Sequence, residues 1–96
     1  MGSLPVNSSV RSAQDLRQVN AVVVDPRNPK IVFVAGPGGV FRSSDAGLNW
    51  EASNQPLNGI VALALNPNQP DTLFAVTAEG KLWRSDNAAQ SWQEIK

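Results

Sequence analysis

The side chains of this sequence that are most able to do chemistry are two carboxylates at expected turns. Asp45 lies in the run Ser-Ser-Asp-Ala-Gly-Leu-Asn-Trp, and Glu79 lies in the run Thr-Ala-Glu-Gly. A typical glycosidase needs two carboxylates at a fixed separation, and symmetry between copies of the chain could bring several Glu79 side chains together. Histidine and cysteine are absent, so the common nucleophile and general-base pairs are missing. We therefore expect no catalytic residue, metal ligand or cofactor.

The run from Ser43 to Trp50 has a physical reason for most of its residues. The carboxylate of Asp45 can accept backbone N–H groups across a tight turn, and Gly47 adopts a positive φ at little cost. Trp50 offers a large apolar face that would plug the turn against a sheet, while its indole N–H needs an acceptor. These features predict a structural turn, and they favour a structural role for Asp45 over a catalytic or metal-binding one.

The same run recurs in altered form near the end of the chain. Ser85 and Trp92 are kept, Asn87 takes the place of the aspartate, and Ala89 takes the place of the glycine. Asparagine retains an acceptor oxygen, but alanine pays a steric penalty at positive φ. We expect the second turn to be strained or differently shaped.

The two runs belong to a longer internal repeat. Matches recur at an offset of 41 residues, as in Ala21 and Ala62, and the offset becomes 42 after one hairpin, as in Trp50 and Trp92. The repeat divides the chain into an N-terminal arm with a link (1–18), a first unit (19–59) and a second unit (60–96). Apolar runs and turn residues predict four short strands in each unit, at 19–24, 31–35, 40–43 and 49–52 and again at 60–65, 72–77, 82–85 and 91–95.

Turn residues separate these strands. The runs Asp-Pro-Arg-Asn-Pro (25–29) and Asn-Pro-Asn-Gln-Pro (66–70) each carry two prolines, which are expected to end a strand. Asn58 and Gly59 resemble a hairpin turn, but the repeat places them in the link between the units. Several strands are apolar on both faces and need cover on both sides.

Four strands in a repeat of about 40 to 45 residues are typical of a β-propeller blade. The Ser-x-Asp-x-Gly-x-x-Trp turn, preceded by Gly-Val-Phe-Arg-Ser and by the Asp-Pro-x-x-Pro corner, resembles the Asp-box (BNR) repeats of bacterial β-propellers. Such repeats occur in sialidases, xyloglucan-degrading enzymes, sortilin-type receptors and photosystem II assembly factors. The resemblance implies an all-β fold of two four-stranded antiparallel blades, with Asp45 on the propeller rim, away from an active site.

Two blades do not close a propeller, which typically has about 4 to 8. The uncovered sheet faces predict self-association, and a ring of three or four copies would give six or eight blades. The alternative is an excised or engineered piece of a longer propeller. In either case the resemblance favours a non-enzymatic scaffold or interaction module that binds a glycan or a protein. The alternative function is a fragment of an Asp-box glycoside hydrolase that lacks its catalytic blades.

Candidate ligand contacts follow from the expected propeller. Asn54, Gln55 and Asn58 lie in the link between units, and Glu79 lies at a hairpin tip on the same expected face. In a ring they would line a central funnel and could bind sugars. Turn formation explains the first three equally well, and an exposed hairpin glutamate is usually only solvated.

Repeated arginines and tryptophans have two interpretations as well. Arg42 and Arg84 occupy equivalent positions and could form an anion-binding ring, but a stem packed over a neighbouring tryptophan is favoured. Trp50, Trp83 and Trp92 could stack on sugars if exposed, whereas their periodic placement favours packing. A sialidase would need a tyrosine nucleophile, which the sequence lacks, and an arginine triad, which is not recognisable.

Charge and hydropathy limit the remaining partners. The chain has 96 residues with Lys+Arg 8 and Asp+Glu 8, which gives a formal net charge of +0. Nucleic acid and anionic membranes are therefore not expected partners. Apolar runs are far shorter than the ~20 residues of a membrane span, and no signal-peptide pattern is present. We expect a soluble protein, and the residues do not indicate its compartment.

Overall fold

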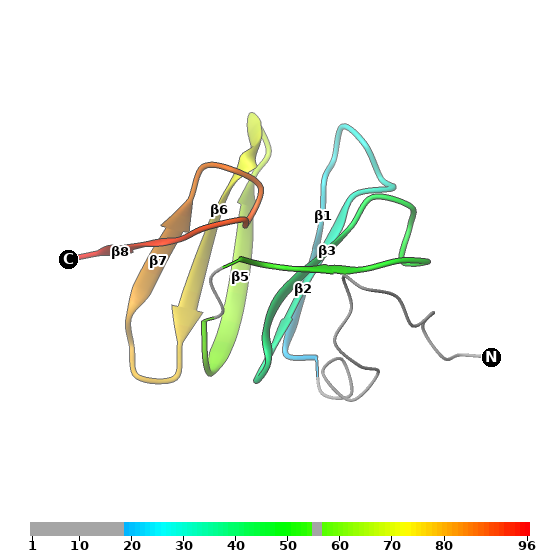
Figure 1. Ribbon diagram of the computed structural model, residues 1–96. Coiled ribbons are helices and arrows are strands. Elements are labelled where there is room, and N and C mark those ends of the chain that lie inside the picture. The colour runs from blue at the N-terminus through cyan, green and yellow to red at the C-terminus, as the bar shows by residue number, and fades with distance from the viewer. Residues whose placement is uncertain (1–18, 55–56) are drawn as a thin grey trace.

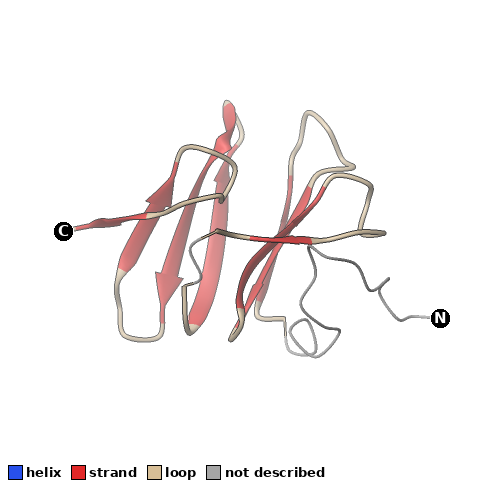
Figure 2. Ribbon diagram, in the orientation of Figure 1, coloured by secondary structure: helices blue, strands red, loops and turns tan. Residues whose placement is uncertain are grey.

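The computed structural model describes residues 19–54 and 57–96, and these residues contain strands and turns but no helix (Figure 2). The predicted N-terminal arm and Gln55 lie outside the described residues. Strands form two separate four-stranded antiparallel sheets. The predicted all-β architecture of two four-stranded units is therefore confirmed. Within the described residues, no helix is long and apolar enough to cross a membrane.

Each sheet is a simple meander of consecutive strands (Figure 1). The first sheet contains β1 (Ala21–Val24), β2 (Val32–Gly36), β3 (Gly39–Ser43) and β4 (Glu51–Ala52). The second contains β5 (Ile60–Asn66), β6 (Gln69–Thr77), β7 (Leu82–Ser85) and β8 (Gln93–Ile95). Asn58 and Gly59 lie between the sheets, in the segment that leads into β5, as the repeat predicts and the dipeptide does not.

Pro67 follows the last residue of β5 as predicted, but the second proline of this corner does not precede the next strand. Asn66 closes β5 and pairs directly with Gln69, so Pro70 lies inside β6. A register shift separates this pair from the pair of Leu65 and Leu73. Proline has no N–H to donate and is tolerated in strands at such irregularities, which is why the prediction of an extended turn over 66–70 is wrong.

The outer strands are shorter than predicted because the turns before them extend further. The N–H of Asn49 donates to the Asp45 carboxylate at 2.8 Å, and the N–H of Ser91 donates to Asn87 Oδ1 at 3.0 Å. Residues 49 and 91 therefore belong to the turns. Strand pairing begins only at Glu51 in β4 and at Gln93 in β8.

The two sheets pack face to face, with β1 and β2 nearest β5 (Figure 1). Strand pairing places the alternate residues of each sheet on opposite faces. The inner face of the first sheet consists of Ala21, Val23, Phe33, Ala35 and Val40. The inner face of the second consists of Leu63, Leu65, Leu73, Ala75 and Trp83, with Trp92 packed on it. These residues form the larger of two apolar clusters.

Polar contacts also join the sheets at their edges. Asn20 Nδ2 donates to the carbonyl of Ile60 at 2.9 Å, which joins the residue before β1 to the first residue of β5. On the opposite edge, the carbonyl of Gln90 accepts the N–H of Asn54 at 3.1 Å and the hydroxyl of Ser53 at 3.3 Å. The two units therefore contact each other at both edges as well as through the apolar cluster.

Candidate functional site

A pocket of about 440 Å³ lies where the link into β5 meets the hairpin between β6 and β7. Its walls combine apolar, amide and charged side chains with the backbone of both segments. The lining residues are Leu57, Asn58, Gly59, Thr77, Ala78, Glu79, Lys81 and Trp83.

Backbone hydrogen bonds hold the two segments of the pocket together. The N–H of Ala78 donates to the carbonyl of Gly59 at 2.8 Å, which ties the hairpin to the link. Within the hairpin, the N–H of Gly80 donates to the carbonyl of Thr77 at 2.9 Å. Gly59 and Gly80 have φ of 70° and 85°, values that glycine adopts without a steric penalty. The pocket is therefore built on a fixed backbone.

The side chains of the pocket offer several kinds of contact. Glu79 and Lys81 are exposed and form an ion pair at 3.8 Å, which contributes little to stability at a surface. Trp83 is half-buried and contributes aromatic surface, and Asn58 contributes an exposed amide. An amide, a carboxylate, an ammonium group and an indole around one hollow can bind the hydroxyl groups and the apolar face of a sugar.

The pocket brings together two of the four predicted ligand contacts. Asn58 and Glu79 both line it, whereas Asn54 is bonded to Gln90 beside the second turn. Sequence reasoning missed Lys81 as a pocket residue and assigned Trp83 to packing. Lys81 and Trp83 lie two residues apart at the start of β7, and the strand period of two could have placed them on one side, whereas Glu79 lies in the turn before them.

The two predicted turns form a second set of polar residues, at the opposite end of the strands (Figure 1). Ser43 Oγ accepts the N–H groups of Gly47 at 2.8 Å and of Asp45 at 3.3 Å, and it donates to the Asp45 carboxylate at 2.8 Å. The carboxylate also accepts the side-chain amide of Asn49 at 2.7 Å. The N–H of Ala46 reaches the carbonyl of Lys30 at 2.9 Å, which anchors the turn to its own sheet.

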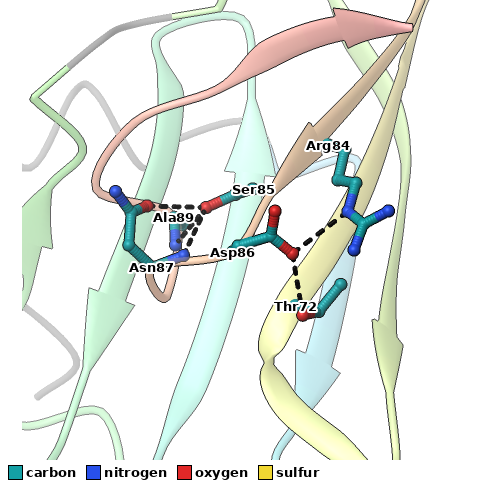
Figure 3. Close-up of polar contacts among 6 residues, drawn as sticks. All are labelled: Thr72, Arg84, Ser85, Asp86, Asn87 and Ala89. Carbon is teal, nitrogen blue, oxygen red and sulfur yellow. Dashed lines mark hydrogen bonds and ion pairs between the residues drawn. The ribbon is translucent and has the colours of Figure 1, made fainter.

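The second turn reproduces this network with Asn87 in the place of Asp45 (Figure 3). Ser85 Oγ accepts the N–H groups of Ala89 at 2.9 Å and of Asn87 at 3.3 Å, and it donates to Asn87 Oδ1 at 2.9 Å. Asn87 Nδ2 donates to Ser91 Oγ at 2.8 Å. Ala89 has φ of 69° and the equivalent Gly47 has φ of 94°, so both residues adopt a positive φ. The second turn therefore keeps the shape of the first, and of the two expected outcomes, strain or a different shape, a positive φ at alanine corresponds to strain.

The Asp45 carboxylate is held in its ionised form. Hydrogen bonds from the side chain and backbone of Asn49, and then from Ser43, lower its pKa from 3.8 to about 2. Both carboxylate oxygens are thus used inside the turn. Within residues 19–54 and 57–96, no group of acidic side chains is arranged to hold a metal ion.

Arg84 is exposed and pairs with Asp86 (Figure 3). Its Nε donates to Asp86 at 3.0 Å, and Asp86 also accepts the hydroxyl of Thr72 at 3.1 Å. Its guanidinium lies 5.8 Å from the ring centre of Phe74, so the aromatic partner is a phenylalanine and not the predicted tryptophan. The equivalent Arg42 is half-buried, and none of the described residues accepts its Nε.

The tryptophans of the two turns are packed. Trp50 is 7% exposed and lies against Val34 and Phe41, and Trp92 is 3% exposed in the larger cluster. None of the described residues accepts the indole N–H of Trp50, in contrast to the expected hydrogen bond. Neither side chain offers a surface for sugar stacking.

No family model matches the chain. It is 30% identical to sortilin of Rattus norvegicus, and equally to sortilin of Mus musculus, over 87 residues, which are 83% of this chain and 10% of sortilin. It is 34% identical to vacuolar protein sorting/targeting protein 10 of Emericella nidulans over 61 residues, which are 62% of this chain and 4% of that protein.

Solved glycoside hydrolases of family GH74 share the fold. An ancestral GH74 enzyme matches with a TM-score of 0.70 at 22% identity, over 81% of this chain and 12% of the enzyme. The GH74 xyloglucanase from Xanthomonas campestris matches with a TM-score of 0.68 at 17% identity, over 77% of this chain and 14% of the enzyme.

These similarities agree with two of the groups named from the repeat, sortilin-type receptors and xyloglucan-degrading enzymes. At such low identity the likeness to the enzymes shows the fold alone. The chain spans about a tenth of sortilin and corresponds to two propeller-type blades.

Proposed function

We propose that this chain is a non-enzymatic β-propeller module that binds a glycan in the pocket between the β6–β7 hairpin and the link into β5. The observation that carries the proposal is the set of side chains around that pocket. Asn58, Glu79 and Lys81 supply donors and acceptors, and Trp83 supplies an aromatic surface. Such sites, with a few polar groups beside an apolar surface, are typical of ligand pockets.

The turns have a separate, structural role in this proposal. We interpret Ser43–Trp50 and Ser85–Trp92 as Asp-box turns, because their serine hydroxyls and their Asp45 or Asn87 oxygens make equivalent bonds. They fix the outer strand of each sheet and carry no ligand.

The absence of a second carboxylate in the pocket supports binding without hydrolysis. Among the lining residues, Glu79 is the one acid, and it is paired with Lys81. Glycoside hydrolysis typically takes a pair of acidic residues. The likeness to GH74 enzymes supports one alternative. In that alternative, the chain is a part of a glycoside hydrolase whose other acidic residues lie elsewhere.

Titration with xyloglucan oligosaccharides, followed by tryptophan fluorescence, tests the proposal. These sugars are a reasonable first probe because one structural neighbour is a xyloglucanase. Saturable binding should weaken at least tenfold in Trp83→Ala and in Asn58→Ala. Asn68→Ala is the matched control, because Asn68 is an exposed asparagine of the corner between β5 and β6, at the opposite end of the strands. This variant should bind the sugar with unchanged affinity.

A reducing-sugar assay on the same oligosaccharides separates the two functions. We expect no release of reducing ends. Turnover that disappears in Glu79→Gln would support the hydrolase instead. Binding that is insensitive to both pocket substitutions would refute the pocket as the site.

A further inference from the structure

Each sheet has an outer face that no described element covers. On the first sheet, strand pairing places Val22, Val24, Val32, Val34 and Phe41 on this face. On the second sheet, the outer face consists of Ala62, Ala64, Phe74, Val76 and Leu82. Trp50 packs on Val34 and Phe41, but Val22 remains 57% exposed and Leu82 remains 36% exposed.

The two outer faces are equivalent to the two faces that already pack together inside the chain. Through the repeat, Val22 and Val24 correspond to Leu63 and Leu65, which pack into the larger apolar cluster. In the same way, Leu82 corresponds to Val40, which is 2% exposed at that interface. The outer face of the first sheet is therefore equivalent to the inner face of the second, and the outer face of the second sheet is equivalent to the inner face of the first. The outer faces of two copies can thus pack together in the way that the inner faces do.

Side-chain sizes in the two interfaces are complementary. Inside the chain, the shared apolar cluster contains leucines of the second sheet and the smaller Ala35 and Val40 of the first. On the outer faces the sizes are exchanged, because valines replace those leucines while Val76 and Leu82 replace Ala35 and Val40. A contact between the outer faces would keep a similar total volume, which close packing requires.

The edges of the outer faces show the same correspondence. Inside the chain, Asn20 contacts Ile60 through a hydrogen bond. The corresponding residues on the outer faces are Val61 and Val19, which are both exposed. An outer contact would therefore bring two exposed valines together where the internal contact has a polar bond.

The opposite edge repeats the pattern. Inside the chain, Ser53 bonds to the carbonyl of Gln90. The corresponding outer residues are Ile95 and Leu48, and Leu48 is 66% exposed. Every large apolar side chain that the described residues expose lies at a position equivalent to part of the internal interface, namely Val19, Val22, Val24, Leu48, Val61, Leu82 and Ile95.

We propose that a second copy of this chain docks head to tail, with the outer face of its first sheet on the outer face of the second sheet. The contact is heterologous, because different surfaces of the two copies meet, and its repetition gives a ring when the rotation between copies closes. Three or four copies give the six or eight blades of a propeller. The proposal rests on the sheet faces and does not depend on glycan binding in the pocket.

Light scattering after size exclusion, over a hundredfold range of concentration, tests the closed ring. We expect a mass of three or four chains that reaches a plateau. A mass of one chain at every concentration would refute the docking, and a mass that rises without a plateau would refute closure.

Two blocked variants test the head-to-tail contact itself. Val22→Asp places a charge on one outer face and Leu82→Asp places it on the other, so each variant alone should have the mass of one chain. A 1:1 mixture should give a two-chain complex, because each variant retains the face that the other has lost. A complex formed by either variant alone, or none in the mixture, would contradict a heterologous contact.

Controls separate loss of docking from loss of folding. Asn28→Asp adds the same charge at an exposed turn, where the Oδ1 atom can still accept the N–H of Lys30, so it should assemble like the wild type. Leu48→Glu, in an exposed turn at the edge of the first outer face, should behave like Val22→Asp. Retained wild-type circular dichroism in both blocked variants confirms that the sheets remain folded.

Discussion

Removal of the Ser43 hydroxyl should destabilise the protein by an amount that its contacts define. Ser43 is 0% exposed, and its Oγ accepts the N–H of Gly47 at 2.8 Å and that of Asp45 at 3.3 Å. In Ser43→Ala, the N–H of Gly47 loses its close acceptor inside the turn. An unsatisfied donor costs about 1–3 kcal/mol when it is buried. The bond to the N–H of Gly47 is part-buried, so we expect the free energy of unfolding to fall by about 1 kcal/mol, the lower end of that range.

Urea unfolding followed by tryptophan fluorescence measures this loss. Protein concentration must be fixed, because association of folded chains shifts apparent stability. In thermal unfolding, each kcal/mol should lower the Tm by about 4–8 °C for a chain of this size.

Two further substitutions make the measurement specific. Ser44→Ala removes an exposed hydroxyl next to the turn serine and should change stability by no more than about 0.5 kcal/mol. Ser85→Ala removes the equivalent acceptor of the Ala89 N–H, at 2.9 Å, and should cost as much as Ser43→Ala. A loss below about 0.5 kcal/mol in Ser43→Ala, or an equal loss in Ser44→Ala, would refute the role of the buried hydroxyl.

Two more predictions concern the first turn. The pKa of Asp45 is lowered from 3.8 to about 2, so its ionised form contributes stability above about pH 4 that is lost as the pH falls towards 2. Asp45→Asn, which introduces the residue found at Asn87, should remove this pH-dependent contribution to stability. The difference in urea midpoint between wild type and variant should therefore shrink from pH 5 to pH 2, and a constant difference would contradict the prediction. Trp50→Ala should cost about 3–5 kcal/mol in urea unfolding, because Trp50 is 7% exposed against Val34 and Phe41; a cost below about 1 kcal/mol would mean that it is not a core residue.

The repeat made most of the fold predictable. The two turns share a serine, an aspartate or asparagine, and a tryptophan at the same spacing. Each of these residues has a local physical role that does not depend on the rest of the chain. Two copies in register fixed the number of strands, and the matching positions explain why Asn58 and Gly59 form a link and not a hairpin.

Local preference failed where other contacts outweigh it. A positive φ costs a non-glycine residue roughly 1–2 kcal/mol, yet Ala88 and Ala89 both adopt it. The N–H of Ala88 reaches the carbonyl of Asp71 at 2.9 Å, and the N–H of Ala89 reaches Ser85 Oγ at 2.9 Å. These bonds fix the backbone of the second turn, so a steric rule applied to one residue could not predict its shape.

The pocket was only partly predictable for a different reason. Glu79 and Asn58 were identified from their places in the hairpin and the link, but their proximity depends on the bond between Ala78 and Gly59 across those segments. A contact between residues so far apart in the sequence has no local signal. Trp83 illustrates the same limit, because its periodic placement suggests packing and its position at the end of the sheets leaves it half-buried beside the pocket.

The differences between the two copies carry information that the shared motif does not. The internal interface is held by a covalent link, which gives the partner sheet a high effective concentration, so polar edge contacts such as Asn20 with Ile60 suffice there. A contact between separate chains must also offset lost translational and rotational freedom, at a cost of roughly 4–15 kcal/mol. In the proposed ring, more apolar edges, such as those of Val61 and Leu48, would supply part of that free energy.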